Sequence, residues 1–257
     1  MIHLAVTGNC PVRSEADCPE GPATAKKRKN MLSDKAKIKK RAEDGGRHLA
    51  AGEYEKAVEE FSAVIDADPE NSSALMSRAR AYVKLRKRSP ALADYTRVIE
   101  IDPENAPAFH ERGRVLRRGK MYDRAISDYT REIGITPRSS PAYNSRGVCH
   151  TAKKDYDRAI EDFTRAVELD PGHALAYYNR GVCYRRKGLS DRAAADFEKY
   201  RQLEPGGKHA ARLDEMAIMD TVKSSNRTKC PSCGKGIKIT ARFCDVCGFD
   251  MKKFING

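Results

Sequence analysis

The chain has 257 residues, a formal net charge of +13, no tryptophan and 40% hydrophobic residues. It contains no run of 18 apolar residues, and its opening Met-Ile-His-Leu-Ala-Val is too short for the core of a signal peptide, so we expect a soluble, cytoplasmic protein with no membrane partner. Four of its eight cysteines form two CxxC pairs, and the other four are poorly spaced for a disulfide framework, which favours reducing surroundings.

Residues 1–35 form a leader that is poor in aromatic residues, and we predict that it is disordered. Four helix-breaking residues interrupt it: Pro11, Pro19, Gly21 and Pro22. A basic run from Lys26 to Lys29 resembles a nuclear import signal, although a solvated tail is the simpler interpretation. Met31 precedes the first repeat and is an alternative translation start.

Proline recurs every 34 residues over most of the chain, at Pro69, Pro103, Pro137, Pro171 and Pro205. Three further columns keep the same register: an alanine 12 residues before each proline, an aromatic residue eight before it, and a glycine or alanine 24 before it. The alanines are Ala57, Ala91, Ala125, Ala159 and Ala193; the aromatic residues are Phe61, Tyr95, Tyr129, Phe163 and Phe197; the small residues are Gly45, Ala79, Gly113, Gly147 and Gly181. The period predicts five successive copies of one helical hairpin.

The segment 142–171 illustrates the hairpin. Apolar residues recur at helical spacing before and after Lys153-Lys154-Asp155, which predicts two amphipathic helices joined by a turn. The small residue of the first helix allows close approach, and the aromatic residue of the second fills the space beyond that contact. Pro171 ends the hairpin because it lacks the N–H that a helix interior needs.

These four columns resemble the tetratricopeptide repeat over residues 36–205. The resemblance implies an all-α fold, a right-handed superhelical solenoid of five helical hairpins. The hairpins are expected at 38–71, 72–105, 106–139, 140–173 and 174–207. The apolar stripe of Ala210, Leu213 and Ala217 then predicts a capping helix at 208–222, and the polar stretch 223–229 predicts a linker.

Two cysteine pairs predict a structural zinc site. Cys230 and Cys233 form the first pair, and Cys244 and Cys247 form the second. Four thiolates suit tetrahedral zinc and close its coordination sphere, so the metal is expected to be structural rather than catalytic. Residues 230–257 resemble a small zinc ribbon, with a short strand expected at 236–240. Zinc would supply the folding free energy of so small a domain, on the order of 10 kcal/mol.

The family resemblance also implies a concave groove lined by the first helix of each repeat. Its expected lining residues are Arg80, Lys84, His110, Arg114, Arg117, Arg118, Tyr178, Arg185 and Arg186. Such a surface favours an acidic or C-terminal carboxylate ligand, because arginine holds a carboxylate by two parallel hydrogen bonds. The alternative interpretation is that these arginines keep a long helical surface solvated and that Tyr178 packs in the interior.

The resemblance argues against one class of partner. Repeats that clamp the carboxylate tails of cytosolic chaperones carry lysine, asparagine and arginine at positions where this chain has Ala42, Gly46, Ser77, Pro107 and Glu111. Four further arginines recur where the family often has leucine, and their regularity favours a structural role across the repeat interface. They are Arg78, Arg112, Arg146 and Arg180.

No constellation typical of an enzyme is present, neither a glycine-rich phosphate loop nor a nucleophile motif. The nearest candidate is Cys149-His150, but neighbours on a helix point about 100° apart and cannot share a proton directly. Cys149 and Cys183 occupy the same position of successive repeats, which favours small packing residues over a redox pair.

Two functional hypotheses remain. The first is a non-enzymatic protein–protein interaction scaffold or adaptor that binds a peptide or partner surface in the groove, with the zinc ribbon as a second docking module. The alternative is a nucleic-acid-associated protein whose basic ribbon contacts phosphates and stacks on a base. Its phosphate contacts would be Lys229, Lys235, Lys238, Arg242, Lys252 and Lys253, and its stacking residues Phe243 or Phe249.

Overall fold

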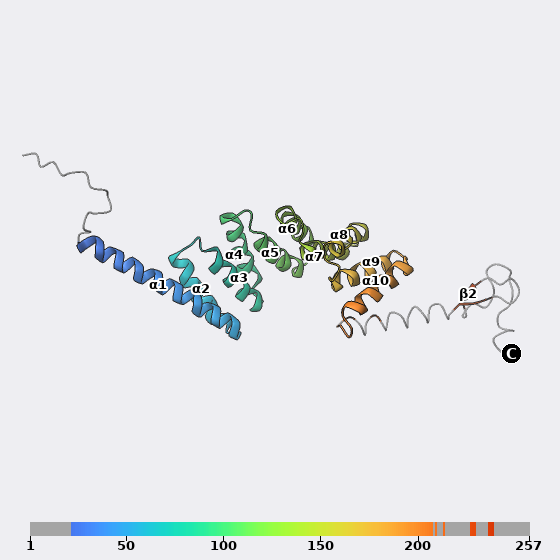
Figure 1. Ribbon diagram of the computed structural model, residues 1–257, viewed down its shortest axis with the longest axis horizontal. Helices are drawn as coiled ribbons and strands as arrows, with labels where there is room; N and C mark the ends of the chain where they lie inside the picture. Colours follow the sequence, from blue (N-terminus) through green and yellow to red (C-terminus); the bar gives the residue numbers. More distant parts are fainter. Residues whose placement is uncertain (1–21, 208, 210–212, 214–226, 230–235, 239–257) are drawn as a thin grey trace, which may run out of the picture. The chain divides into compact units, whose positions relative to one another are not determined.

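A computed structural model describes residues 22–207, 209, 213, 227–229 and 236–238. Within these residues the chain forms ten α-helices and two short strands, coloured from blue to red along the sequence in Figure 1. The chain divides into two compact units, residues 1–115 and 116–257, and the boundary falls inside a helix.

In the first unit, successive helices from α1 to α4 pack against one another, and α1 also contacts α3. The helices of this unit are α1 (Pro22–Ala51), α2 (Tyr54–Ala67), α3 (Ser72–Lys84), α4 (Arg88–Ile101) and α5 (Ala106–Arg118), whose last residues belong to the second unit. One core contains Phe61 and Val64 of α2, and another contains Tyr95 of α4 and Val115 of α5.

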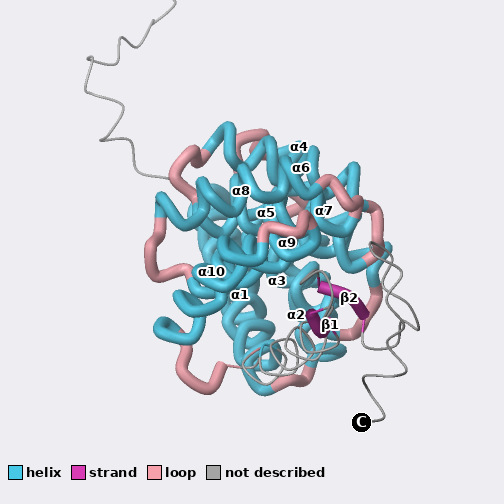
Figure 2. Tube along the Cα trace, turned by 90° about the vertical axis from the view of Figure 1, so that its right-hand side faces the viewer, coloured by secondary structure: helices cyan, strands magenta, loops and turns pink. Residues whose placement is uncertain are grey.

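The second unit continues the same pattern. Its helices are α6 (Tyr122–Ile135), α7 (Ser140–Ala152), α8 (Tyr156–Leu169), α9 (Ala174–Arg186) and α10 (Ser190–Leu203). Two strands follow, β1 (Arg227–Lys229) and β2 (Gly236–Lys238), which pair antiparallel and are drawn in magenta in Figure 2. From α2 onward, equivalent helices begin 34 residues apart, so the predicted period and the helical repeat fold are confirmed.

Each second helix of a repeat ends two residues before the recurring proline, at Ala67, Ile101, Ile135, Leu169 or Leu203. The residue before a proline is disfavoured in the helical conformation, which explains the stop. Three of the next helices then begin with a side-chain cap: Asn71 Oδ1 accepts from the N–H of Ala74 at 2.9 Å, Asn105 Oδ1 from that of Ala108 at 3.1 Å, and Ser139 Oγ from that of Ala142 at 3.3 Å.

The turn between the two helices of a repeat contains one residue in the left-handed region. This position is occupied by Gly52, Arg86, Lys120, Lys154 and Gly188, with φ between 59° and 81°. Glycine adopts such a φ without a steric penalty, whereas the three cationic residues adopt it at a cost. The turn expected at Lys153 to Asp155 is therefore confirmed, and the spacing of these residues repeats the 34-residue period.

The small residue of the first helix lies directly against the aromatic ring of the second. A Cβ placed on Gly147 would come within 2.8 Å of the Phe163 ring, and one placed on Gly181 within 2.6 Å of Phe197. The alanine of the second helix is also closed off, since Ala159 is 0% exposed. The close helix approach predicted from these columns is confirmed.

A recurring arginine joins three helices. Arg146 on α7 donates from Nε and Nη2 to the carboxylate of Asp162 on α8, at 3.0 and 2.7 Å, and from Nη1 to Thr130 on α6 at 3.1 Å. Arg78 and Arg180 make the same contacts with Asp94 and Ser62, and with Asp196 and Thr164. The structural role predicted for Arg78, Arg146 and Arg180 is confirmed, and the fourth arginine of the set, Arg112, donates from Nη1 to Thr96 at 3.1 Å.

At the two ends of the chain the structure departs from two expectations. α1 begins at Pro22, so residues 22–35 are helical rather than disordered; Ala, Lys, Arg, Met and Leu favour helix, and proline suits the first helical position. β1 occupies the last three residues of the expected linker 223–229, because they pair with β2. Residues 1–21 and most of the expected capping helix 208–222 lie outside the described residues.

Candidate ligand groove of the first unit

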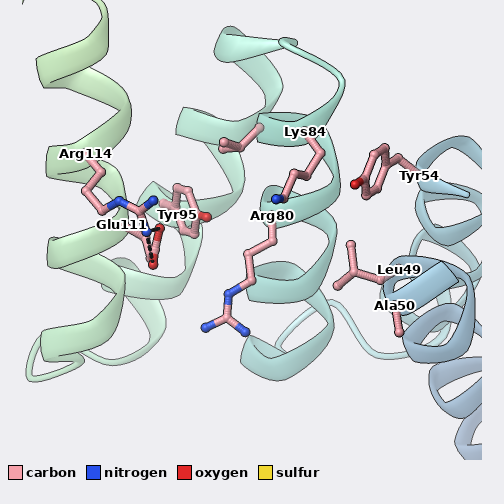
Figure 3. A pocket seen from close by; sticks show the side chains of 9 residues that line it. Leu49, Ala50, Tyr54, Arg80, Lys84, Tyr95, Glu111 and Arg114 are labelled. Atoms are coloured by element: carbon pink, nitrogen blue, oxygen red, sulfur yellow. Dashed lines mark hydrogen bonds and ion pairs between the residues drawn. The ribbon is translucent and has the colours of Figure 1, made fainter. Parts of the chain in front are cut away.

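A pocket of about 430 Å³ lies within the first unit, where side chains from all five of its helices converge (Figure 3). It is lined by Leu49 and Ala50 of α1, Tyr54 of α2, Arg80, Val83 and Lys84 of α3, Tyr95 of α4, and Glu111 and Arg114 of α5. Three of the predicted groove residues, Arg80, Lys84 and Arg114, are therefore brought to one site.

Two cations of this pocket are uncommitted. Arg80 and Lys84 lie four residues apart on α3, which places them on the same face of the helix. Both side chains are exposed, and neither forms a hydrogen bond or an ion pair within the described residues. Their charge is available to an anionic ligand.

The third cation already has a partner. Arg114 Nη1 donates to both carboxylate oxygens of Glu111, at 2.8 and 2.9 Å. The two residues are three apart on α5, and Figure 3 shows the pair on the side of the pocket opposite α1. Since each charge compensates the other, the positive potential of the pocket comes mainly from α3.

Tyr95 contributes a buried hydroxyl to the pocket. Its side chain is 0% exposed, and its Oη has no hydrogen-bond partner within the described residues. Burial raises the pKa of Tyr95 above its usual value, so the hydroxyl keeps its proton at neutral pH. The group is therefore a hydrogen-bond donor for which the described part of the chain supplies no acceptor.

The remaining wall is apolar. Leu49 and Tyr54 are half-buried and pack against the core of α2, and Val83 packs against the core that contains Tyr95. The pocket thus combines an aliphatic and aromatic wall with a few polar groups, an arrangement common at ligand sites.

The other predicted groove residues are distributed differently. His110 is half-buried on α5 and does not line this pocket, Arg117 is half-buried, and Arg118 is exposed. On α9, Arg185 is half-buried and Arg186 is exposed. Arg117 and Arg118 belong to the second unit, so the described geometry does not join them to Arg114 in one site.

Tyr178 is not a surface residue. It is 5% exposed, and its ring stacks on His209 with centroids 4.2 Å apart. Tyr200 and Leu213 belong to the same core. The expectation that Tyr178 lines an open groove is therefore wrong, because the segment after α10 supplies the ring and the leucine that cover it.

Sequence reasoning missed five of the residues that line the pocket, namely Leu49, Ala50, Tyr54, Tyr95 and Glu111. The family rule considers only the first helix of each repeat, so it could not select Tyr54 or Tyr95, which lie on second helices. One signal was available: tyrosine stands at 95 and 129 where the same column has phenylalanine in the other three repeats.

The four predicted zinc ligands, Cys230, Cys233, Cys244 and Cys247, lie outside the described residues. β1 and β2 flank the first cysteine pair in the sequence and place Thr228 opposite Ile237. Among the described residues, no group of three or more His, Cys, Asp or Glu side chains is arranged to hold a metal ion. Zinc binding at the C-terminus stays a prediction.

Cys149 and His150 do not form a nucleophile and base. Burial raises the pKa of the Cys149 thiol to about 11, so almost none of it is thiolate at neutral pH. His150 is 8% exposed, and its ring nitrogens lie 3.9 Å from Asp162 and 4.0 Å from Asp155. Both residues have the surroundings of packing residues.

No described helix is both long enough and apolar enough to span a membrane.

Several solved structures share the fold. A crystal structure of MamA is 25% identical with a TM-score of 0.60, over 63% of this chain and 95% of that one. MamA from Desulfovibrio magneticus RS-1 is 23% identical with a TM-score of 0.62, over 67% and 97% of the two chains. YrrB, described as a TPR protein with an unusual peptide-binding site, is 22% identical with a TM-score of 0.60, over 73% and 97%.

No curated protein matches the chain at a significant level. A family model of the tetratricopeptide repeat matches four overlapping segments, residues 45–106, 77–140, 113–172 and 150–208. Together these segments span more than half of the 257 residues. The chain therefore belongs to the tetratricopeptide repeat family.

Proposed function

We propose that this protein is a non-enzymatic interaction scaffold that binds an acidic peptide segment of a partner protein in the pocket of the first unit. The observation that carries the proposal is the pair Arg80 and Lys84, two exposed cations without ion-pair partners in the described residues, beside an apolar wall. Cations that form no ion pair within the protein can attract an anionic ligand.

The fold supports this proposal in a general way. Helical repeats offer an extended surface with many side chains from different elements, and such surfaces serve binding rather than chemistry. YrrB, a protein of the same fold, is described as having a peptide-binding site. Recognition of an acidic segment is the specific part, and it depends on the charges of α3.

We also propose that the C-terminal cysteines bind one structural zinc ion and make the ribbon a second docking module. The paired strands β1 and β2 support this, because the segment between them contains Cys230 and Cys233, and the pairing brings the two ends of that segment together. The expected result is one zinc per chain by elemental analysis, lost when Cys230 and Cys233 are both replaced by serine. A metal content unchanged by these substitutions would contradict the proposal.

Selection from a random library of 12-residue peptides on the full-length protein tests whether the pocket binds acidic peptides. Peptides rich in Asp and Glu should be enriched on the unchanged protein and lost on an Arg80→Glu/Lys84→Glu variant. The control is Lys87→Glu/Arg88→Glu, which has the same net charge and changes two exposed cations of the first unit outside the pocket. Equal enrichment on both variants would remove the pocket from consideration.

A further inference from the structure

The aromatic column of the repeats contains two kinds of side chain. Phe61, Phe163 and Phe197 pack their rings directly against Gly45, Gly147 and Gly181, so a phenyl ring is sufficient for this packing. Tyr95 occupies the same column in the first unit and carries a hydroxyl in addition. The hydroxyl of Tyr95 is therefore not required by the repeat fold.

The position of this hydroxyl is unfavourable in the absence of a ligand. It is buried and has no hydrogen-bond partner within the described residues, and Tyr95 lines the pocket. A buried donor without an acceptor costs free energy that phenylalanine would not incur. Figure 3 shows the hydroxyl end of Tyr95 between the Arg114–Glu111 pair of α5 and Arg80 of α3. An acceptor that enters the pocket would relieve this cost.

The charges near Tyr95 indicate which acceptor fits. Arg80 and Lys84 are cations without partners in the described part of the chain, whereas the carboxylate of Glu111 is already held by Arg114. A hydrogen bond from a neutral donor to an anionic oxygen is stronger than one to a neutral oxygen. An anionic oxygen therefore suits both the hydroxyl and the uncommitted cations.

We infer that Tyr95 donates a hydrogen bond to an anionic side-chain oxygen of the bound peptide, while Arg80 and Lys84 compensate its charge. This inference rests on the proposed function of the pocket and identifies the residue that recognises the anionic group of the ligand. Leu49 and Val83 then accept a neighbouring apolar side chain, so the ligand class is a segment that combines acidic and aliphatic residues. Nucleic acid suits the site less well, because it has no aliphatic side chain for that wall.

The test compares Tyr95→Phe with the unchanged full-length protein by fluorescence anisotropy. The probe is a labelled peptide of four Glu-Leu pairs with blocked ends; a Gln-Leu peptide and a phosphoserine-Leu peptide are its comparisons. Tyr95→Phe is expected to weaken binding of the Glu-Leu peptide about 10-fold. Tyr129→Phe, in the same column but not lining this pocket, should bind like the unchanged protein.

Thermal unfolding without peptide separates folding from binding. Tyr95→Phe should unfold at the same temperature as the unchanged protein or higher, because its hydroxyl makes no hydrogen bond within the described residues. If Tyr95→Phe binds as tightly as the unchanged protein while Arg80→Glu/Lys84→Glu does not bind, the role of Tyr95 is overturned. The pocket then still stands as the peptide-binding site. If the unchanged protein binds neither anionic peptide, both proposals are overturned.

Two further outcomes identify the anion. Binding of the phosphoserine peptide alone, with the same dependence on Tyr95, supports the inference with phosphate as the source of the oxygen. Displacement of the peptide by polyuridine, with equal affinity for Tyr95→Phe and the unchanged protein, overturns it in favour of a phosphate backbone held by charge alone.

Discussion

Arg146 on α7 and Asp162 on α8 form a two-point ion pair in which the carboxylate side chain is 6% exposed. Replacing Arg146 by Met would leave a buried carboxylate without its cation, and we expect a loss of about 3 kcal/mol in the free energy of unfolding. Urea unfolding followed by circular dichroism measures the loss. Arg165→Met, which removes an exposed pair with Glu168, should cost far less, because solvent screens the two charges. Similar losses for the two variants would contradict a structural role of Arg146.

Gly147 is expected to resist substitution although it lies in a helix. Gly147→Ala places a Cβ 2.8 Å from the Phe163 ring, and the strain should exceed the gain in helix propensity, for a net loss of about 1 kcal/mol. Gly134→Ala on α6 is the matched control, because no described atom outside the backbone of its own helix lies within 4 Å of the added Cβ, and it should gain about 0.5–1 kcal/mol. Ala79 occupies the equivalent position beside Tyr95, so the hairpin itself should survive. Two shifts of the same sign in thermal unfolding would refute this explanation.

Lys154 holds the left-handed turn position at φ 65°. Lys154→Gly removes the clash between Cβ and the backbone, and we expect a gain of about 0.5–1 kcal/mol in stability. The reciprocal change is Gly188→Ala at the same position of the next repeat, where φ is 77° and the space beside the residue is open. It should cost about 1 kcal/mol for purely backbone reasons. Calorimetry should show a higher unfolding temperature for Lys154→Gly and a lower one for Gly188→Ala.

The thiols of Cys149 and Cys183 should be unreactive in the folded protein. Burial raises the pKa of Cys149 to about 11 and also raises that of Cys183. At pH 8 only about one Cys149 side chain in a thousand is then ionised, so alkylation by iodoacetamide should be much slower than in urea. Mass spectrometry of digested protein locates the label. Rapid labelling of either residue under native conditions would show that it is not a buried packing residue.

Two histidines, the buried His150 and the half-buried His173, should make stability depend on pH. Burial lowers the pKa of His150, against the opposing effect of Asp162 and Asp155, and burial also lowers the pKa of His173. Below about pH 6.5 the unfolded chain therefore binds more protons than the folded chain, so stability falls as the pH falls from 7 to 5. A His150→Gln/His173→Asn variant should show a shallower fall in urea midpoints. An unchanged slope would exclude these residues as its cause.

The candidate site was only partly predictable from the sequence. Arg80, Lys84 and Arg114 were selected because the family rule gives the face of one helix, and helix faces follow from local spacing. The same rule placed Tyr178 in a groove, but a residue beyond α10 covers it, as the stacking of His209 shows. The rule selects a helix face and not ion pairs, so it did not indicate that Arg114 is held by Glu111 one turn earlier.

Local sequence patterns were enough to predict the repeat length, the ends of the helices at each proline and the close contacts within a hairpin. These properties depend on proline, glycine and side-chain volume at fixed spacings, which act over a few residues. Which side chains are covered and which charges are compensated depends instead on contacts between residues far apart in the chain. Tyr95 shows the reason: the column predicts its packing, but its hydroxyl, which has no partner among the described residues, becomes significant only because side chains from α1, α2, α3 and α5 surround the same pocket.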